Sequence, residues 1–294
     1  MLAGDLEGAW RHTDALEAPR RNGGTIEPYH LRWDGTPFDG RVVLVRCLHG
    51  LGDTLQFMRF VPQVVAGARR VHFLVQPMLL GMLQGAPGLG DVSDAWTDDP
   101  PAHDVEIEVM ELAYALRCQA GAIPPPYPLL PHVQEREVPI DGRGSRMRVG
   151  LLWAASDWDP SRSVPLAALR PLLEVPGVQF FSLQQGPAAM EPNASRFGLK
   201  PLWERTSRIE DAAAAMRQMD LIICVDGMPA HLAATLGRPT WVMLKHEADW
   251  RWMREREDTP WYPGMRLFRQ GRGEDWGGVA VRLAGALGRV IGGG

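Results

Sequence analysis

Short apolar runs alternate with stretches of helical periodicity along most of the chain. The runs are rich in Val, Leu and Ile and are bounded by polar residues or glycine, which is typical of strands buried on both faces. This alternation predicts stacked βα units around parallel sheets. The predicted strands are Val42–Arg46, Val71–Val75, Val105–Glu108, Arg148–Trp153, Val178–Leu183, Leu221–Val225 and Thr240–Leu244. The predicted helices follow Asp53 and Pro229 and cover Pro77–Leu83, Val109–Cys118, Pro165–Leu173, Ile209–Met219 and Gly277–Ile291, and residues 5–15 form a weaker amphipathic segment.

A proline-rich stretch, Ile123–Val138, separates two series of βα units and excludes both a helix and a central strand. The fold class is therefore α/β, with two Rossmann-like, doubly wound parallel-sheet domains that face a cleft. The predicted parts are 1–34 as a helical or linker segment, 35–122 as the first domain, 123–147 as the linker, 148–275 as the second domain and 276–294 as a helix and tail.

Composition narrows the class of protein. Hydrophobic residues make up 45% and charged residues 22% of the 294 residues, which is ordinary for a globular chain. The 31 basic and 35 acidic residues leave a net charge of −4, so no nucleic-acid partner is expected. No apolar stretch approaches about 18 residues and no signal peptide is evident, so we expect a cytoplasmic protein without a transmembrane segment. Cys47, Cys118 and Cys224 are expected to be buried free thiols.

Several catalytic classes are excluded by their missing motifs. Leu55 stands where the dinucleotide-binding motif G-x-G-x-x-G requires its third glycine. The chain also lacks a Walker A loop, a G-x-S-x-G elbow and an H-E-x-x-H helix. Dehydrogenase, P-loop ATPase, serine hydrolase and zincin functions are therefore not expected.

The first candidate site is the glycine turn His49–Asp53, which leads from a predicted strand into a helix. Asp53 can cap that helix by accepting a backbone N–H bond, and on the residues alone this is the more common role. The alternative role is that of a catalytic base at the edge of the cleft.

A second strand-to-helix turn begins at Asp226 and continues through Gly227, Met228 and Pro229. Free N–H groups at a helix N-terminus bind phosphate, and His231 stands one turn into this helix. Taken alone, His231 is more often a structural histidine than a ligand-binding one.

A polar loop follows the first strand of the second half. Its sequence Asp157-Trp158-Asp159 invites a D-x-D metal site, but a solvated turn is the favoured interpretation. Gln184 and Gln185 end a later strand, where they can contact a base or ribose or form a structural amide network. The aromatic residues in Asp249–Arg254 are expected to be mostly buried.

Taken in order, these segments resemble a known family. They are Gly50–Phe57, Arg162–Leu166, Ser182–Gly186, Val225–Asp226 with Ala230–Ala233, Gly237–Trp241, Asp249–Trp252 and Trp261–Pro263. The series looks like the GT-B glycosyltransferase module found behind tetratricopeptide repeats, which is related to the lipopolysaccharide heptosyltransferases (glycosyltransferase family 9-like). The resemblance covers about residues 30–285 and implies a GT-B fold, a nucleotide-sugar donor on the second domain and an acceptor on the first.

The resemblance also implies roles for individual residues. Asp53 would be the general base of an inverting, metal-independent transfer to a glycan, peptide or small-molecule hydroxyl, with no cofactor besides the nucleotide sugar. Donor-site candidates are Arg162, Gln184, Gln185, Asp226, Gly227, Met228 and His231. Acceptor-side candidates are His49, Gly52 and Gln56.

Two departures from the family pattern keep alternatives open. Gly227 and Met228 stand where the family usually has threonine and a small residue, and Ala154 and Ala155 stand where a glycine is usual. An inactive GT-B binding module and a GT-B nucleotide-sugar epimerase therefore remain alternatives.

Overall fold

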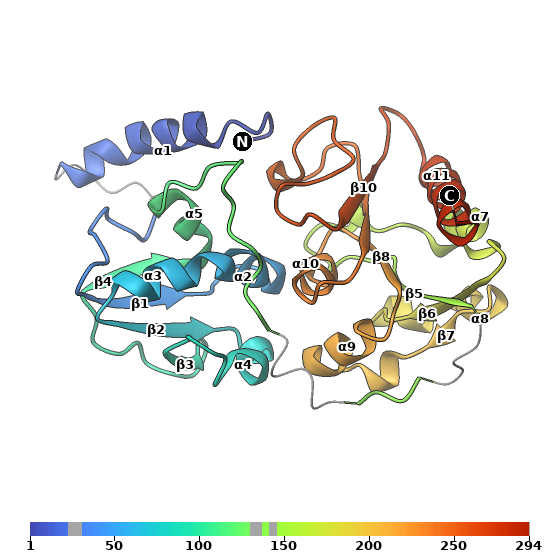
Figure 1. Cartoon of the computed structure of the whole chain (residues 1–294), viewed down its shortest axis with the longest axis horizontal. Coiled ribbons are helices and arrows are strands. Elements are labelled where there is room, and N and C mark those ends of the chain that lie inside the picture. The colour runs from blue at the N-terminus through green and yellow to red at the C-terminus, as the bar shows by residue number, and fades with distance from the viewer. Residues whose placement is uncertain (23–30, 130–136, 141–145, 294) are drawn as a thin grey trace. The chain divides into compact units, whose positions relative to one another are not determined.

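The computed structural model describes residues 1–22, 31–129, 137–140 and 146–293. The chain divides into two compact units, Met1–His132 and Val133–Gly294, each built on its own parallel sheet (Figure 1). The division falls inside the predicted linker 123–147, of which residues 130–136 and 141–145 lie outside the described part.

Unit 1 contains a four-stranded sheet in the order β3-β2-β1-β4, with every pair parallel. Its strands are β1 (Val42–Arg46), β2 (Arg70–Val75), β3 (Asp91–Asp94) and β4 (Val105–Glu108). Its helices are α1 (Leu6–Arg21), α2 (Leu51–Phe57), α3 (Val61–Gly67), α4 (Pro77–Leu83) and α5 (Leu112–Ala115), with 3-10 turns η1 (Met58–Phe60) and η2 (Val109–Glu111). The middle of the central strand β1, Val43–Val45, is apolar and fully buried, as expected for a strand that is covered on both faces.

Unit 2 contains a six-stranded parallel sheet in the order β10-β9-β8-β5-β6-β7. Its strands are β5 (Met147–Leu152), β6 (Val178–Ser182), β7 (Lys200–Pro201), β8 (Leu221–Val225), β9 (Thr240–Leu244) and β10 (Met265–Arg269). Its α-helices are α7 (Arg170–Leu173), α8 (Asn193–Arg196), α9 (Ile209–Met216), α10 (Met228–Thr235) and α11 (Trp276–Ile291). Its 3-10 turns are η3 (Pro160–Arg162), η4 (Leu166–Leu169), η5 (Pro187–Met190), η6 (Trp203–Arg205) and η7 (Trp250–Trp252).

Helix α11 closes one face of the unit 2 sheet. Its side chains Leu283 and Leu287 are fully buried in the same core cluster as Val149 and Leu151 of β5. On β5, Gly150 leaves room for its neighbours, because a Cβ there would lie 2.7 Å from the Ile222 side chain and 2.8 Å from that of Leu183. Close packing of three adjacent segments therefore requires glycine at this position.

The predicted strands are all present, and the parallel α/β architecture is confirmed in both units. Three strands that the sequence analysis did not predict, β3, β7 and β10, each lie at an edge of a sheet. The predicted helix Val109–Cys118 was too long, because it consists of η2 and the short α5, and Arg117 then adopts a φ of 52°. The predicted helix Pro165–Leu173 is instead the 3-10 turn η4 followed by α7.

Helix α1 is longer than the predicted segment 5–15 and packs against unit 1. The Trp10 indole donates to the Cys118 carbonyl at 2.7 Å, and its ring lies 5.8 Å from that of Tyr114. Asp14 accepts two bonds from Arg117 at 2.8 Å and one from the Tyr114 hydroxyl, and the bonds from Arg117 and Tyr114 lower the pKa of Asp14. An aromatic contact and a charged network thus hold this helix in place.

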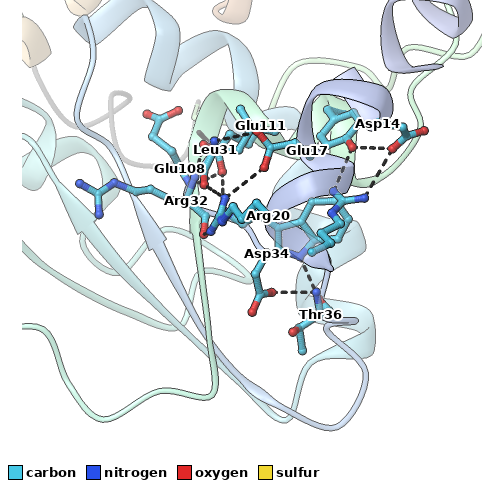
Figure 2. A network of polar contacts seen from close by, with 12 residues as sticks. Asp14, Glu17, Arg20, Leu31, Arg32, Asp34, Thr36, Glu108 and Glu111 are labelled. Carbon is cyan, nitrogen blue, oxygen red and sulfur yellow. Dashed lines mark hydrogen bonds and ion pairs between the residues drawn. The ribbon is translucent and has the colours of Figure 1, made fainter. Parts of the chain in front are cut away.

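A second polar network joins the end of α1 to the segment before β1 (Figure 2). Arg20 donates to Glu17 and to the carbonyls of Leu31 and Arg32. The partly buried Glu111 then accepts the backbone N–H groups of Arg32 and Trp33 at 2.8 and 3.0 Å. Burial raises the pKa of Glu111 although these bonds oppose the shift.

The three cysteines are buried free thiols, as predicted. Across the described part of the chain, no helix combines the length and apolar character that crossing a membrane would require.

The packing of α1 gives a first testable prediction. Trp10→Ala should cost about 3 kcal/mol or more, because it removes a buried aromatic ring that is 6% exposed. Hydrogen exchange should then speed up in the α1 amides by on the order of 100-fold. The matched control is Leu16→Ala on the same helix, where the side chain is 59% exposed and protection should persist. Unchanged exchange in Trp10→Ala would show that α1 is not held by this contact.

Candidate functional site

In unit 1, the loop after β1 forms the glycine turn that leads into α2. Gly50 is the N-cap residue of α2, and Asp53 in the first turn accepts the Gly50 N–H at 3.0 Å. This is the reciprocal half of a capping box. The capping role considered for Asp53 is therefore present in the structure, and its role as a base stays a prediction.

Two buried polar residues from the neighbouring strands hold this turn in place. Gln76, directly after β2, donates to the His49 carbonyl at 2.8 Å and accepts the Thr54 hydroxyl at 3.0 Å. Glu108, the last residue of β4, lies on the other side with its carboxylate 3.1 Å from His49 Nδ1. The sequence analysis missed both residues, although each is a polar residue at the carboxyl end of an apolar strand.

The acceptor-side candidates differ in exposure. The His49 side chain is 60% exposed, whereas Gly52 is buried. Gln56 has no exposed surface, and its amide atoms have no hydrogen-bond partner in the described part of the chain. Residues 54–61 are all buried, and the contact of Gln56 with an acceptor stays a prediction.

In unit 2, Gln184 organises the start of the loop after β5. Its Oε1 accepts the N–H groups of Trp153 and Ala154 at 3.0 and 2.9 Å, and its Nε2 donates to the carbonyls of Ala154 and Gln185. The side chain is buried and its amide is fully used, so the structural alternative describes Gln184 best. Gln185 points its Nε2 at Thr206 and Trp203 instead.

The same loop carries a charged cluster farther along. Lys245, directly after β9, donates to Asp159 at 2.7 Å and to the Ser161 hydroxyl at 3.0 Å. The bond from Lys245, and after it the bond that the Ser161 hydroxyl donates to Asp159, lower the pKa of Asp159 to about 2. The carboxylate of Asp159 is thus paired with an ammonium group. Within the described ranges no group of three or more His, Cys, Asp or Glu side chains is placed to hold a metal ion.

Arg162 lies beside this cluster and connects it to β8. Its guanidinium donates to the Asp226 carbonyl at 3.1 Å and packs over the Trp158 ring, with its central carbon 5.4 Å from the ring centroid. Trp158 itself is 85% exposed. The residues after β5, β8 and β9 therefore meet at one edge of the sheet, as adjacent parallel strands require.

In the turn after β8, Asp226 is buried, whereas Gly227, Met228 and Pro229 are partly exposed. Burial raises the pKa of Asp226, against the opposing effects of Trp252, Arg251 and Arg162. Gly227 is the N-cap of α10 and Met228 is its first residue.

His231, in the first turns of α10, is buried in an aromatic cluster. Its Nδ1 lies 3.0 Å from the Tyr262 hydroxyl, and its ring stacks on Trp252 with centroids 5.5 Å apart. The predicted burial of the aromatic segment is confirmed for Trp252, which has no exposed surface. His231 thus has partners within unit 2, as a structural histidine would have. Its contact with a donor stays a prediction.

These two parallel-sheet units give the chain an α/β fold of the GT-B class. Among solved structures it is similar to the E. coli heptosyltransferase WaaC with ADP-2-deoxy-2-fluoro heptose, with a TM-score of 0.58, 13% identity and coverage of 86% of this chain and 99% of that one. It is also similar to a family 9 glycosyl transferase from Veillonella parvula, with a TM-score of 0.55, 12% identity and coverage of 80% and 87%.

Among curated proteins, the chain is 24% identical to Protein FlbA of Caulobacter vibrioides in an alignment 287 residues long, which covers 87% of this chain and 48% of FlbA. The chain thus spans about half the length of that relative. No protein-family profile matches it.

The Asp159–Lys245 pair predicts a pH dependence of stability. The pKa of Asp159 is lower in the folded state than its ordinary value of 3.8, so the pair stabilises fully above about pH 4 and loses its effect as the pH falls toward 2. Asp159→Asn should lower the free energy of unfolding at pH 7 by no more than about 1 kcal/mol, which a thermal melt would show as a lower Tm. The difference in Tm between wild type and Asp159→Asn should shrink below about pH 4. The exposed neighbour gives a control, since Asp157→Asn should be nearly silent. A difference for Asp159→Asn that is constant from pH 7 to pH 3 would contradict the pairing.

Proposed function

We propose that the chain is a glycosyltransferase that binds a nucleotide-sugar donor on unit 2 and an acceptor hydroxyl on unit 1. The observation that carries the proposal is the meeting of Arg162 and Lys245 at the carboxyl edge of the unit 2 sheet, beside the N-terminus of α10. A departing diphosphate needs cationic groups and N–H donors at such a place. The GT-B fold and a structural neighbour that holds an ADP-linked sugar support this assignment.

The reaction proposed is an inverting transfer without a metal ion. Arg162 and Lys245 would supply the positive charge that a bound cation supplies in other transferases. Asp159 is paired with Lys245, so its carboxylate would not be available as a metal ligand. Asp226, whose carbonyl accepts a bond from Arg162, is buried, and this burial raises its pKa. The finer assignments, namely nucleobase, sugar and acceptor, depend on binding experiments with named compounds.

One alternative, a binding module without turnover, has specific support. Gln184 and His231 both make contacts within the unit, and Asp53 caps its own helix. Gly227 and Met228 also provide no hydroxyl for a phosphate. Donor binding without release of the nucleoside diphosphate would favour this module over the enzyme.

Calorimetry with ADP, UDP, GDP and CDP, and with their common sugar conjugates including ADP-heptose, tests the donor site. Arg162→Ala should weaken binding of the tightest compound by about 1–3 kcal/mol, because a charge-assisted contact is lost. The matched control is Arg170→Ala, an arginine of the same unit with a 68% exposed side chain, which should bind normally. Equal affinities for wild type and Arg162→Ala, or no binding of any compound, would contradict the proposed donor site.

The role of Asp53 is tested by comparing two substitutions. Asp53→Asn retains a side-chain oxygen that can accept the Gly50 N–H, but it accepts no proton at neutral pH. If Asp53 is the base, Asp53→Asn should keep its Tm and donor affinity while turnover falls by on the order of 100- to 10,000-fold. If Asp53 is a cap alone, Asp53→Asn should be nearly silent and Asp53→Ala should cost about 1 kcal/mol of stability. Release of nucleoside diphosphate is the readout, with water as the acceptor.

A further inference from the structure

Trp158, in the loop after β5, is the most exposed large hydrophobic residue in the part of the chain that the structure describes. Its relative exposure is 85%, followed by 71% for Trp96 of unit 1. Single exposed apolar side chains are common on protein surfaces, so exposure alone assigns no role. The loop that carries Trp158 distinguishes it, because polar contacts fix this loop on both sides of the indole.

The two ends of this loop are bonded to each other. The Ala155 N–H donates to the Ser163 hydroxyl at 3.0 Å, and the Val164 N–H donates to the Trp153 carbonyl at 2.7 Å. Trp158 lies between these bonds, in a turn near the middle of the loop. The exposed indole is therefore carried by a closed loop.

Further contacts join the loop to the ends of β8 and β9. Lys245 donates to Asp159 at 2.7 Å, and Arg162 donates to the Asp226 carbonyl at 3.1 Å. The guanidinium of Arg162 also packs over the Trp158 ring, with its central carbon 5.4 Å from the ring centroid. One face of the indole is thus supported by the arginine, and the high exposure of the residue leaves the opposite face to solvent.

The contact with Arg162 places the indole close to the proposed diphosphate. A phosphate oxygen bonded to this guanidinium would lie about 3 Å from its nitrogens. In a nucleotide sugar, the sugar is joined directly to its phosphate, whereas the ribose separates the base from the other phosphate. A ring that packs on the phosphate-binding arginine is therefore within closer reach of the sugar than of the base.

The surroundings of the indole also suit a sugar. A pyranose has faces of C–H groups, which pack on an aromatic ring, and hydroxyls at its rim, which form hydrogen bonds. Asp157, beside Trp158 in the same turn, is exposed, and an ionised carboxylate accepts hydrogen bonds from hydroxyls. The turn thus combines an apolar ring face with a neighbouring hydrogen-bond acceptor.

We propose that the open face of Trp158 packs against the donor sugar and contributes to the choice of that sugar. The inference rests on the proposed function and deepens it, since it assigns the donor a pyranose whose C–H groups gather on one face. Arg162 binds the diphosphate, and Trp158 adds affinity for the sugar beyond that for the nucleoside diphosphate.

Calorimetry tests this added affinity. The probes are whichever of ADP, UDP, GDP and CDP binds the wild type most tightly and a sugar conjugate of the same nucleotide, which is ADP-heptose for ADP. Trp158→Ala should weaken the conjugate about 10-fold and leave the Kd of the nucleoside diphosphate within about twofold. Trp158→Phe should keep the conjugate within about threefold of wild type, because an aromatic face remains.

The matched control is Trp96→Ala, which removes an exposed tryptophan from unit 1 and should leave both affinities unchanged. Unchanged conjugate affinity in Trp158→Ala overturns the proposal. Equal weakening of the nucleoside diphosphate and the conjugate overturns it as well, because Trp158 would then act through Arg162 or contact the base.

A second experiment observes the ring itself. In the full chain labelled with 5-fluorotryptophan, the fluorine signal that is missing from Trp158→Phe belongs to Trp158. This signal should move more with the sugar conjugate than with the nucleoside diphosphate, and the Trp96 signal should stay in place with both. A Trp158 signal that a saturating amount of conjugate leaves in place overturns the proposal.

These outcomes separate the inference from the proposed function. Absence of nucleotide binding, or wild-type affinity in Arg162→Ala, would contradict the donor site on unit 2 and overturn the inference with it. Binding that depends on Arg162, together with wild-type conjugate affinity in Trp158→Ala, would contradict the sugar contact alone and leave the donor site supported.

Discussion

Parallel pairing of one central strand with two neighbours is the constraint on which both candidate sites depend. β1 lies between β2 and β4, and β5 lies between β6 and β8. Where a central parallel strand ends, its loop leaves the hydrogen-bond ladder at the same edge as the ends of its neighbours. Buried N–H and C=O groups of that loop must then find polar side chains. The neighbouring strand ends are the nearest source of such side chains.

Both units meet this requirement in the same way. A glutamine after the strand on one side binds the loop backbone, Gln76 in unit 1 and Gln184 in unit 2. An acid stands at the end of the strand on the other side, Glu108 in unit 1 and Asp226 in unit 2. The acids differ in their surroundings. Glu108 lies 3.1 Å from the exposed imidazole of His49, whereas Asp226 has Trp252, Arg251, Asp249 and Arg162 around it.

The sequence predicts the interior of each sheet well, because a strand buried on both faces must be a nearly continuous apolar run. The edge strands were missed for the same reason, since β3 is Asp-Val-Ser-Asp and β7 is Lys-Pro. Single turns were also visible in the sequence, so the glycine turn and the turn at Asp226 were found. Glu108 and Lys245 were missed as site residues because their importance depends on the order of strands in the sheet, which local patterns do not encode. The sequence alone did not distinguish a structural role of the Gln184 amide from ligand binding, because that distinction depends on the hydrogen bonds that the amide makes in the fold.

Lysine at position 245 suits the geometry of its two contacts. Only two of the 31 basic residues are lysines. An ammonium is a compact charge with three donors, and Lys245 directs two of them to Asp159 and Ser161, which are only two residues apart. Arg162 also lies 3.8 Å from Asp159, so one carboxylate stands between two cations. Lys245, Arg162 and Asp159 together carry one net positive charge, although the chain as a whole carries −4.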